Sequence, residues 1–567
     1  MGYKNFKVAI YCRVGDLNNI KDLDKFREDF KFFEKHLSVD KVYLETFRGS
    51  ENITRERMLE FKAFFKEKGI KTSGGITTLP AEEHKGFDSM CYSNEQHRKL
   101  LKATVEFTAE IFDEIILDDF YFTNCKCEGC IKEKGERSWT EFRLAQMKQV
   151  SEELVVKPAK KINPNINMII KYPNWYEHYQ DAGYNLEDEP KIFDMIYTGT
   201  ETRDPQYTQQ HLPKYLSYFL MRYLENVKPG KNAGGWFDPY ECNYNLGYYI
   251  EQAILTLLGK TKEVTLFCLE SLLEQGGSLF IPMVGHIFSK LDENLQLLEN
   301  PTGTACYLPY HSSGEDFLHN YVGMLGIPLE PYPYYPEQAK TVFLTENASK
   351  DEEIVGKIKS SLIKGSDVII TSGLLTALQD SGLDQICKIR DKGKKAKVDR
   401  YGVSHLGISY SKFTNSGKSI NIPQLVYSTN DTWALISALG EENNFPVLLK
   451  VSYGKGRLFV LTIPEDFGDI YNYPKEVINS IRTVFQKDSF ISLDARSKIG
   501  LFTYSNESFA LESFLPFQEE VSVIVNKPEA KLINLETGAE LPGQKVDEKT
   551  IFKFTMNPTT YKLFKVK

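Results

Sequence analysis

Residues 95–119, EQHRKLLKATVEFTAEIFDEIILDD, join a long amphipathic stretch to a short apolar one that ends in two carboxylates. This pattern predicts a helix followed by a buried strand. The same unit recurs over roughly the first half of the chain, with candidate strands at 7–13, 41–46, 71–77, 114–119, 167–172, 193–199, 233–238 and 263–269. Eight strand–helix units are typical of a (β/α)₈ TIM barrel, whereas a doubly wound sheet needs no eighth unit.

The rest of the chain predicts two further domains, because 567 residues exceed what one hydrophobic core serves. The turn residues Pro301-Thr302-Gly303 mark the first boundary. A second α/β pattern follows, with strands at 341–344 and 367–371 and a hairpin of 447–451 with 458–463. Short strands separated by turns then predict a small β-sandwich. We therefore predict a barrel at 1–300, an α/β domain at 301–488 and a sandwich at 489–567.

Composition narrows the class of protein. With 41% hydrophobic and 26% charged residues the chain is globular, and its net charge of −8 offers no basic face for nucleic acid. No apolar run is long enough to cross a membrane. The N-terminal MGYKNFKVAIYCRV lacks the pattern of an export leader, which predicts a cytoplasmic protein, or a periplasmic or secreted one if a leader was removed. No Gly-rich phosphate loop is present, so no organic cofactor is expected.

A barrel carries its active site at the carboxyl ends of its strands, so these ends predict the chemistry. Here they are rich in carboxylates and large aromatic side chains. The residues at these ends are Glu45, Arg48, Asp118, Asp119, Tyr172, Trp175, Glu201, Arg203, Trp236, Asp238 and Glu270. Aromatic rings stack on sugars, and carboxylates bind their hydroxyl groups. Cleavage of a glycosidic bond needs one protonated carboxyl and one ionised carboxylate. The strand ends therefore predict a glycoside hydrolase.

Three carboxylates are the candidate catalytic groups. Asp119 and Asp238 are the expected primary pair, and Glu201 is the main substitute for either. Side chains alternate along a strand, so we expect only one of Asp118 and Asp119 to face the barrel axis, and Asp119 lies nearer the mouth. The remaining strand-end residues are predicted to bind substrate. As an alternative, such carboxylates cap helices or form ion pairs, and such aromatic residues belong to the core.

A cluster of cysteines follows the fourth predicted strand. Cys125, Cys127 and Cys130 form a tight C-x-C-x-x-C, and Cys91 lies on the neighbouring strand–helix loop. Four converging thiolates are a typical structural Zn²⁺ site. The alternatives are reduced, unliganded cysteines or a redox pair.

With these motifs the chain resembles the bacterial β-galactosidases of glycoside hydrolase family 42. The resemblance implies a TIM barrel, an α/β trimerisation domain related to glutamine amidotransferases, and a small C-terminal β domain. It also implies a structural zinc held by the four cysteines, and a homotrimer. The stretches YLPYHSSGEDF (307–317) and SYGKGRLFVLTIP (452–464) look like that trimerisation module.

Two departures indicate a distant relative rather than a clear member. Where the family has an Asn-Glu pair at strand four, this chain has Asp118-Asp119, and Asp238 replaces the nucleophilic glutamate of strand seven. The strand-six GTETR also permits an α-galactosidase-like arrangement, with Asp119 as nucleophile and Glu201 as acid/base.

The expected activity is hydrolysis of a terminal sugar or short oligosaccharide, with galactosidase-like specificity among the expectations. A rival interpretation is a carbohydrate-binding or scaffold protein that has lost the catalytic pair. A third, a metal-dependent hydrolase of another bond, is weaker because the strand ends carry no histidine.

Overall fold

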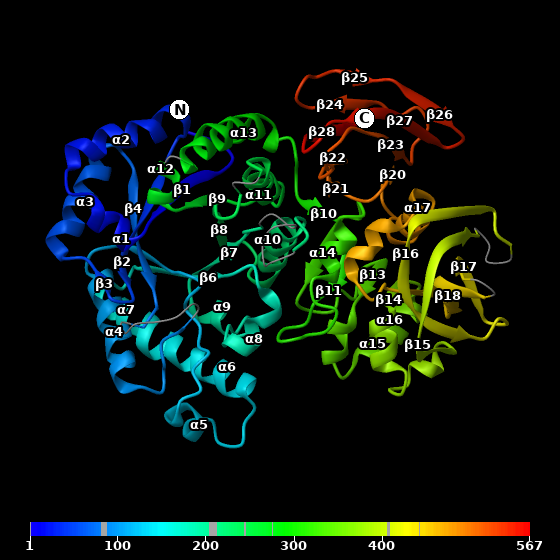
Figure 1. Ribbon diagram of the computed structural model, residues 1–567, viewed down its shortest axis with the longest axis horizontal. Coiled ribbons are helices and arrows are strands. Elements are labelled where there is room, and N and C mark those ends of the chain that lie inside the picture. The colour runs from blue at the N-terminus through cyan, green and yellow to red at the C-terminus, as the bar shows by residue number, and fades with distance from the viewer. Residues whose placement is uncertain are drawn as a thin grey trace. The chain divides into compact units, whose positions relative to one another are not determined.

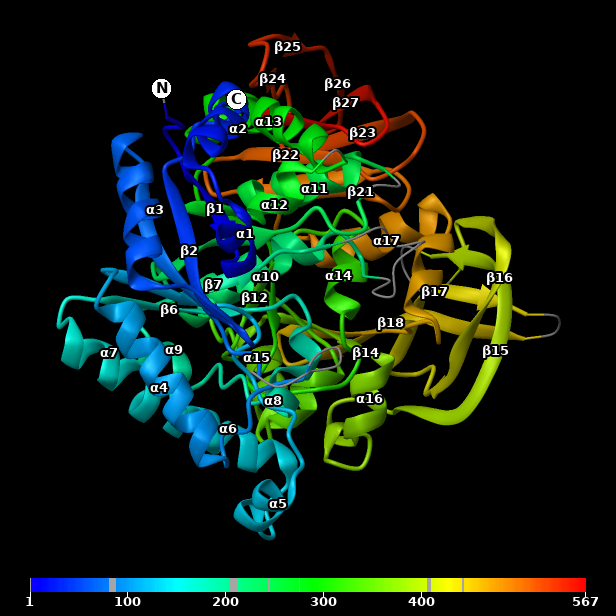
Figure 2. The same cartoon turned by 60° about the vertical axis from the view of Figure 1, so that its left-hand side comes forward.

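The computed structural model describes residues 2–80, 88–202, 212–242, 245–274, 276–404, 409–440 and 443–567. The chain forms two compact units, residues 1–296 and 297–567 (Figures 1 and 2).

The first unit is a closed barrel of eight parallel strands, in which β1 pairs with both β9 and β2. The strands are β1 (Lys7–Cys12), β2 (Lys41–Arg48), β4 (Lys71–Thr77), β5 (Glu114–Leu117), β6 (Asn167–Tyr172), β7 (Met195–Gly199), β8 (Asn232–Phe237) and β9 (Glu263–Phe267). A two-residue strand, β3 (Glu51–Asn52), pairs antiparallel with β2. The predicted TIM barrel is confirmed.

Helices follow the strands around the outside of the barrel (Figure 1). They are α1 (Val14–Asn19), α2 (Leu23–His36), α3 (Arg55–Glu67), α4 (Glu95–Ala109), α5 (Glu128–Lys134), α6 (Trp139–Val150), the π-helix η1 (Ser151–Val156), α7 (Lys157–Ile162), α8 (Tyr179–Ala182), α9 (Glu189–Ile192), α10 (Leu216–Val227), α11 (Gly247–Leu258), α12 (Leu269–Leu273) and α13 (Phe280–Leu295). Helix α4 begins where the Asn94 side chain accepts the free backbone N–H groups of residues 96 and 97.

Large aromatic side chains fill the barrel interior. The Trp236 ring lies 4.6 Å from that of Tyr11 and 6.5 Å from that of Tyr197. At the amino ends of the strands, Lys41 lies 2.8 Å from Glu263 and neutralises this buried carboxylate. The barrel interior is therefore filled with side chains. An active site that a substrate can reach is expected at the opposite, carboxyl end of the strands.

The second unit begins with a nine-stranded mixed sheet in the order β12-β11-β13-β14-β19-β18-β17-β15-β16. Its strands are β11 (Thr304–Tyr307), β12 (Leu329–Tyr332), β13 (Thr341–Leu344), β14 (Asp367–Thr371), β15 (Ile389–Val403), β16 (Lys412–Tyr427), β17 (Thr432–Leu439), β18 (Asn444–Tyr453) and β19 (Gly456–Leu461). The helices are α14 (Leu318–Gly323), α15 (Ile354–Lys364), α16 (Ser372–Leu378) and α17 (Lys475–Phe485). Strands β12 to β19 of this order run parallel, as expected for an α/β domain.

A two-sheet sandwich ends the chain. One sheet has the order β10-β21-β22-β28-β24-β25 and the other β20-β23-β27-β26. The strands are β10 (Pro301–Thr302), β20 (Ile491–Asp494), β21 (Ile499–Tyr504), β22 (Ser508–Ser513), β23 (Glu519–Val525), β24 (Leu532–Asn534), β25 (Glu540–Leu541), β26 (Gly543–Val546), β27 (Lys549–Met556) and β28 (Tyr561–Val566). Apolar side chains of both sheets share one core, so the predicted sandwich is confirmed.

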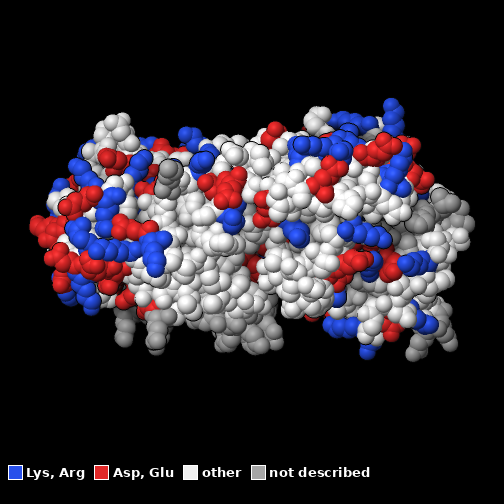
Figure 3. All heavy atoms as spheres, turned by 90° about the horizontal axis from the view of Figure 1, so that it is seen from above, with Lys and Arg blue, Asp and Glu red and all other residues white. Residues whose placement is uncertain are grey.

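The described helices include none with the length and apolar character that a bilayer crossing requires. On the face drawn in Figure 3, basic and acidic side chains are interleaved rather than gathered into a patch of one sign.

Candidate active site

Lys171, on β6, lies at the centre of the carboxylates at the barrel mouth. Its Nζ donates to Asp119 Oδ2 at 2.5 Å and to Glu201 Oε1 at 2.9 Å, and lies 3.7 Å from Asp118 Oδ1. The Lys171 side chain is only 2% exposed. Its Nζ also lies 4.5 Å from the centre of the Trp236 ring. One buried ammonium group thus gathers three carboxylates from the ends of two other strands.

Asp118 and Asp119 both contact Lys171, although strand alternation predicted that only one of them would face the axis. That prediction is wrong because β5 ends at Leu117, and the alternation of side chains holds only within a strand. The Asp118 Oδ1 accepts the backbone N–H of Asp119 at 2.8 Å, which turns the chain at this point. Both carboxylates therefore reach the same cluster.

A second basic side chain holds Asp118 from the other side. Arg48, at the end of β2, donates to Asp118 Oδ2 at 3.0 Å and to Glu45 at 3.1 Å. Glu45 is fully buried and also accepts the Tyr11 hydroxyl at 2.8 Å and the backbone N–H of Val14 at 2.8 Å. Glu45 and Arg48 thus form a buried framework behind Asp118.

The pKa values of Asp118, Asp119 and Lys171 are shifted in different directions. Burial, with the charges of Asp118 and Glu201, raises the pKa of Asp119 to about 7 although Lys171 opposes the shift. Burial also acts on Asp118, but Lys171 and Arg48 hold the pKa of Asp118 below its usual value. Burial opposes the charged form of Lys171, but the surrounding carboxylates outweigh burial and raise the pKa of Lys171 above its usual value. Lys171 therefore remains charged, while Asp119 exchanges a proton near neutral pH.

Glu201 lies just beyond the end of β7 and is 5% exposed. Its Oε1 accepts from Lys171, and its buried Oε2 has no hydrogen-bond partner among the described residues. A methyl group added at Gly199 would lie 2.6 Å from that Oε2. A glycine at this position thus leaves room for the carboxylate.

Two further predicted carboxylates lie at neighbouring strand ends. Asp238, after β8, is 5% exposed, and its Oδ1 accepts the backbone N–H of Tyr240 at 3.1 Å. Glu270, on α12 after β9, forms an ion pair with Arg13 at 2.7 Å, and its side chain is 39% exposed. Glu270 thus belongs to an ion pair at the edge of the barrel.

The aromatic residues predicted to stack on a sugar differ in their exposure to solvent. Tyr172 and Trp236 are buried in the described structure, and the Tyr172 hydroxyl donates to Glu189 at 3.3 Å. Trp175 is half-buried, and its ring lies 5.6 Å from that of Phe122. Trp175 is therefore the predicted tryptophan that keeps an accessible surface. Arg203 lies outside the described residues.

Lys171 is the residue that sequence reasoning missed. The strand NMIIKY carries one charged side chain, directly after the apolar residues 168–170. A lysine within such a buried strand must find a counter-charge, because an unpaired ammonium group in a barrel interior is costly. That requirement was the available signal.

The four predicted cysteines come together. Cys91 Sγ lies 3.6 Å from Cys127 Sγ and 3.5 Å from Cys130 Sγ, and the last two are 3.7 Å apart. All four sulfur atoms, including that of Cys125, lie within 4.8 Å of one another. Tetrahedral Zn²⁺ with Zn–S bonds of about 2.3 Å separates its sulfur ligands by about 3.8 Å. The four thiols fit such an ion. Cys125 and Cys127 come from the loop before α5, the helix that projects from the barrel in Figure 1, while Cys130 lies on α5 and Cys91 on the loop before α4.

Known families match this architecture piece by piece. Residues 1–280 match the family of probable glycosyl hydrolase catalytic domains, and residues 490–566 match the C-terminal domain of probable glycosyl hydrolases. Residues 300–466 match the second domain of the uncharacterized protein SSO3021. The full SSO3021 protein of Saccharolobus solfataricus is 26% identical over 518 residues, which cover 81% of this chain and 82% of that protein.

Solved structures extend the likeness to the whole chain. Gan42B, a GH42 β-galactosidase from G. stearothermophilus, matches with a TM-score of 0.64 and 11% identity, over 100% of this chain and 98% of that one. The chain has the fold of the GH42 enzymes. An α-L-fucosidase, isoenzyme 2 from Paenibacillus thiaminolyticus, matches equally well, with a TM-score of 0.66 and 11% identity over 100% of both chains. The GH42 fold therefore leaves the sugar open, and the substrate must be argued from the side chains at the mouth.

Proposed function

We propose that this distant GH42 relative is a glycoside hydrolase in which Asp119 and Glu201 are the catalytic pair. The observation that carries the proposal is the shared contact with Lys171. Because the two carboxylates lie 2.5 and 2.9 Å from one nitrogen, their nearest oxygens are at most about 5.4 Å apart, the sum of the two contacts. Retaining glycosidases hold their two carboxyl groups about 5–5.5 Å apart.

The roles follow from the environment of each group. Asp119, with a pKa raised to about 7 by burial and neighbouring charge, serves as the acid that protonates the leaving oxygen. Glu201, beside the charged Lys171, attacks the anomeric carbon and forms a glycosyl-enzyme ester. Asp119, now ionised, then takes a proton from the water that hydrolyses this ester. The sugar leaves with its anomeric configuration retained.

The pH dependence follows from the acid role of Asp119. The first step needs the protonated form, which is lost as pH rises through about 7. We therefore expect kcat/KM to fall above that pH, tenfold for each pH unit. If kcat/KM instead rises as the pH passes 7, the ionised form of Asp119 is the reactive one, and Asp119 is the nucleophile.

The substrate class is a glycoside with a terminal neutral sugar. Support comes from the acid-rich mouth, from the half-buried Trp175 as a stacking surface, and from the β-galactosidase and α-L-fucosidase names of the structural neighbours. Galactose and fucose share the axial C4 hydroxyl arrangement in opposite enantiomeric series, so both anomers of each belong in the test panel.

The test is hydrolysis of aryl galactosides and fucosides by the intact chain and by three variants. Asp119→Asn should lower kcat/KM by about 10²–10⁴-fold for nitrophenyl leaving groups, and less for dinitrophenyl groups that need no proton. Glu201→Gln should abolish turnover of every substrate, because even an activated leaving group does not compensate for the loss of the nucleophile. Asp238→Asn is the matched control variant, because the sequence analysis predicted Asp238, in place of Glu201, as the catalytic partner of Asp119.

Two results would overturn the assignment. Near-full activity of Asp119→Asn would remove its acid role, and loss of turnover in Asp238→Asn with retention in Glu201→Gln would restore Asp238 as the partner. Sugar binding without turnover by the unaltered chain would favour the rival carbohydrate-binding function.

We further propose that Cys91, Cys125, Cys127 and Cys130 hold one structural Zn²⁺. The close sulfur contacts support a closed four-thiolate site with no open position for substrate. The ion would fix the loops after β4 and β5, the second of which follows Asp119. A homotrimer, implied by the resemblance, also stays a proposal.

A further inference from the structure

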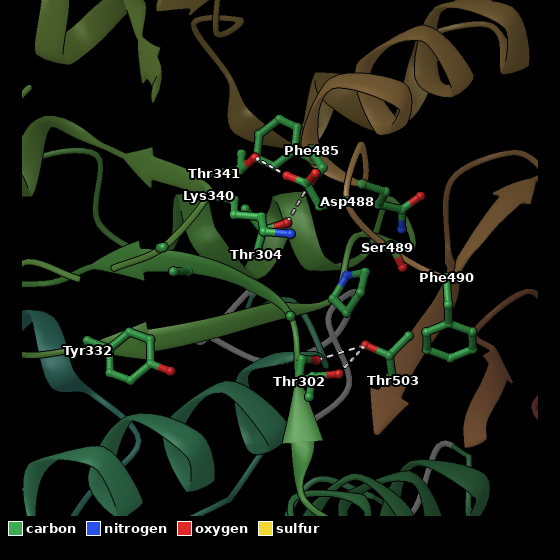
Figure 4. A pocket seen from close by; sticks show the side chains of 15 residues that line it. Thr302, Thr304, Tyr332, Lys340, Thr341, Phe485, Asp488, Ser489, Phe490 and Thr503 are labelled. Carbon is green, nitrogen blue, oxygen red and sulfur yellow. Dashed lines mark hydrogen bonds between the residues drawn. The ribbon is translucent and has the colours of Figure 1, made fainter. Parts of the chain in front are cut away.

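The second unit contains a cavity lined only by its own residues. It has a volume of about 360 Å³ and opens beside the amino ends of β11 and β13, the segment after α17, and β21 (Figure 4). Sites for small molecules commonly measure about 300–1,000 Å³. The cavity is therefore large enough for a small ligand.

Four threonines line this cavity, and all of their hydroxyl groups donate to the protein. Thr302 donates to Thr503 Oγ1 at 3.1 Å, and Thr503 donates to the backbone oxygen of residue 302 at 2.8 Å (Figure 4). Thr304 donates to the backbone oxygen of Phe485 at 2.9 Å, and Thr341 donates to Asp488 at 3.4 Å. Since a hydroxyl has one proton and two lone pairs, these side chains offer the cavity acceptors rather than donors.

The charges and rings of the lining narrow the ligand further. Lys340 and Asp488 are exposed lining residues of opposite sign, so the cavity favours no net ligand charge. Tyr332 and Phe490 are half-buried and lie on opposite sides of the view in Figure 4. Aromatic rings offer stacking surfaces to the C–H faces of a sugar. The required ligand is neutral and rich in hydroxyl donors.

We propose that this cavity is a second, non-catalytic site for a neutral monosaccharide or the end of an oligosaccharide. The site depends only on the second unit, so it does not require the catalytic assignment in the barrel. Its function is to hold a sugar chain or product on the protein independently of hydrolysis.

The test measures binding of free galactose, fucose, glucose and mannose to the full chain by calorimetry and saturation-transfer NMR. Ala339→Trp fills the cavity with a large side chain, and Thr304→Val removes one of the acceptor hydroxyl groups at similar volume. Ala539→Trp is the matched control, because Ala539 is exposed and is not a lining residue. Free sugars are not hydrolysed, so the measurement does not depend on turnover.

We expect at least one sugar to bind the unaltered chain and the Ala539→Trp control equally. Ala339→Trp and Thr304→Val should each weaken that binding at least tenfold at this site while kcat/KM for aryl glycosides stays unchanged. If Ala339→Trp fails to fold, Thr304→Val alone decides the result. The proposal is overturned if no sugar binds, or if every bound sugar is held equally well by both cavity variants.

Discussion

At the scale of single residues, the carboxylates of the barrel mouth depend on Lys171. Its ammonium group contacts both Asp119 and Glu201 and lies 3.7 Å from Asp118. A buried ion cluster of this kind adds little net stability when complete, but it becomes costly when one partner is removed. We therefore expect its loss to affect both stability and activity.

Lys171→Met should lower the free energy of unfolding by about 3–5 kcal/mol near pH 7, because it leaves buried carboxylates without a counter-charge. Lys171 lowers the pKa values of Asp118 and Asp119, so both rise in the variant. Folded-state pKa values above those of the unfolded chain give stability that is present at low pH and lost as pH rises through them. The destabilisation should therefore grow between about pH 4 and pH 8.

Thermal unfolding across that pH range checks this expectation, with kcat/KM measured alongside. The matched control is Lys160→Met, which breaks the Lys160–Asp194 pair at 2.7 Å on the surface and should change stability by at most about 1 kcal/mol. Equal, pH-independent effects of the two substitutions would contradict the account of Lys171.

The same residue marks the limit of prediction from sequence. Asp119, Glu201 and Asp238 are predictable because they follow apolar strands, and barrel topology gathers strand ends. Lys171 lies within its strand. There the hydrophobic pattern indicates a buried strand that contains one charged residue, and it does not indicate a role for that residue. The register that aims its ammonium group between two particular carboxylates comes from the closed sheet, in which β6 pairs with β5 and β7.

Among the elements, the loop that carries Cys125 and Cys127 and leads into α5 is the one that the proposed Zn²⁺ would stabilise. Its thiols lie close to one another and to that of Cys91, beside a small apolar cluster that includes Phe142 and Trp139. Metal binding that occurs only in the folded state stabilises that state.

We expect elemental analysis to give about one zinc per chain, and Cys130→Ser to remove it and lower the melting temperature, by roughly 2–4 °C for each kcal/mol lost. Cys387→Ser is the matched control, because Cys387 is a buried thiol outside the cluster and should keep the zinc. A metal-free chain with the same melting temperature as the zinc-loaded chain would refute the site.

Elements with strong apolar patterns were predictable and polar ones were not. Strands β13 and β14 were predicted at their observed bounds because they are apolar and buried. Strands β15 and β16 were missed, since sequences such as IRDKGKKAKVDRYGV have neither apolar alternation nor an apolar run. Figure 2 shows these two strands as a long curved pair at the end of the sheet, where much of their surface faces solvent.

At the scale of the whole molecule, the second unit is held together by a buried arginine. Arg482 on α17 is 1% exposed and donates to the backbone oxygens of Leu325 at 2.6 Å and of Ala495 at 2.5 Å. It also donates to the backbone oxygens of Leu493 at 3.2 Å and Arg496 at 3.0 Å. The guanidinium thus links the α/β domain to the first strand of the sandwich.

Arg482→Met should lower the stability of the second unit by about 3 kcal/mol or more, because several buried carbonyl groups lose their donor. Hydrogen exchange at β20 should accelerate, while exchange within the barrel strands should not change. Arg496→Met, at an exposed side chain, is the control. Unaltered exchange at β20 would show that the sandwich does not depend on this contact.

The central claim is that one lysine holds two reacting carboxyl groups too close together for inversion, with their nearest oxygens at most about 5.4 Å apart. The most direct measurement is proton NMR of the anomeric signal released from an aryl glycoside in the first minutes of hydrolysis. The account predicts that the first product has the anomeric configuration of the substrate. A first product of opposite configuration would contradict it, because inversion requires carboxyl groups about 6.5–9.5 Å apart.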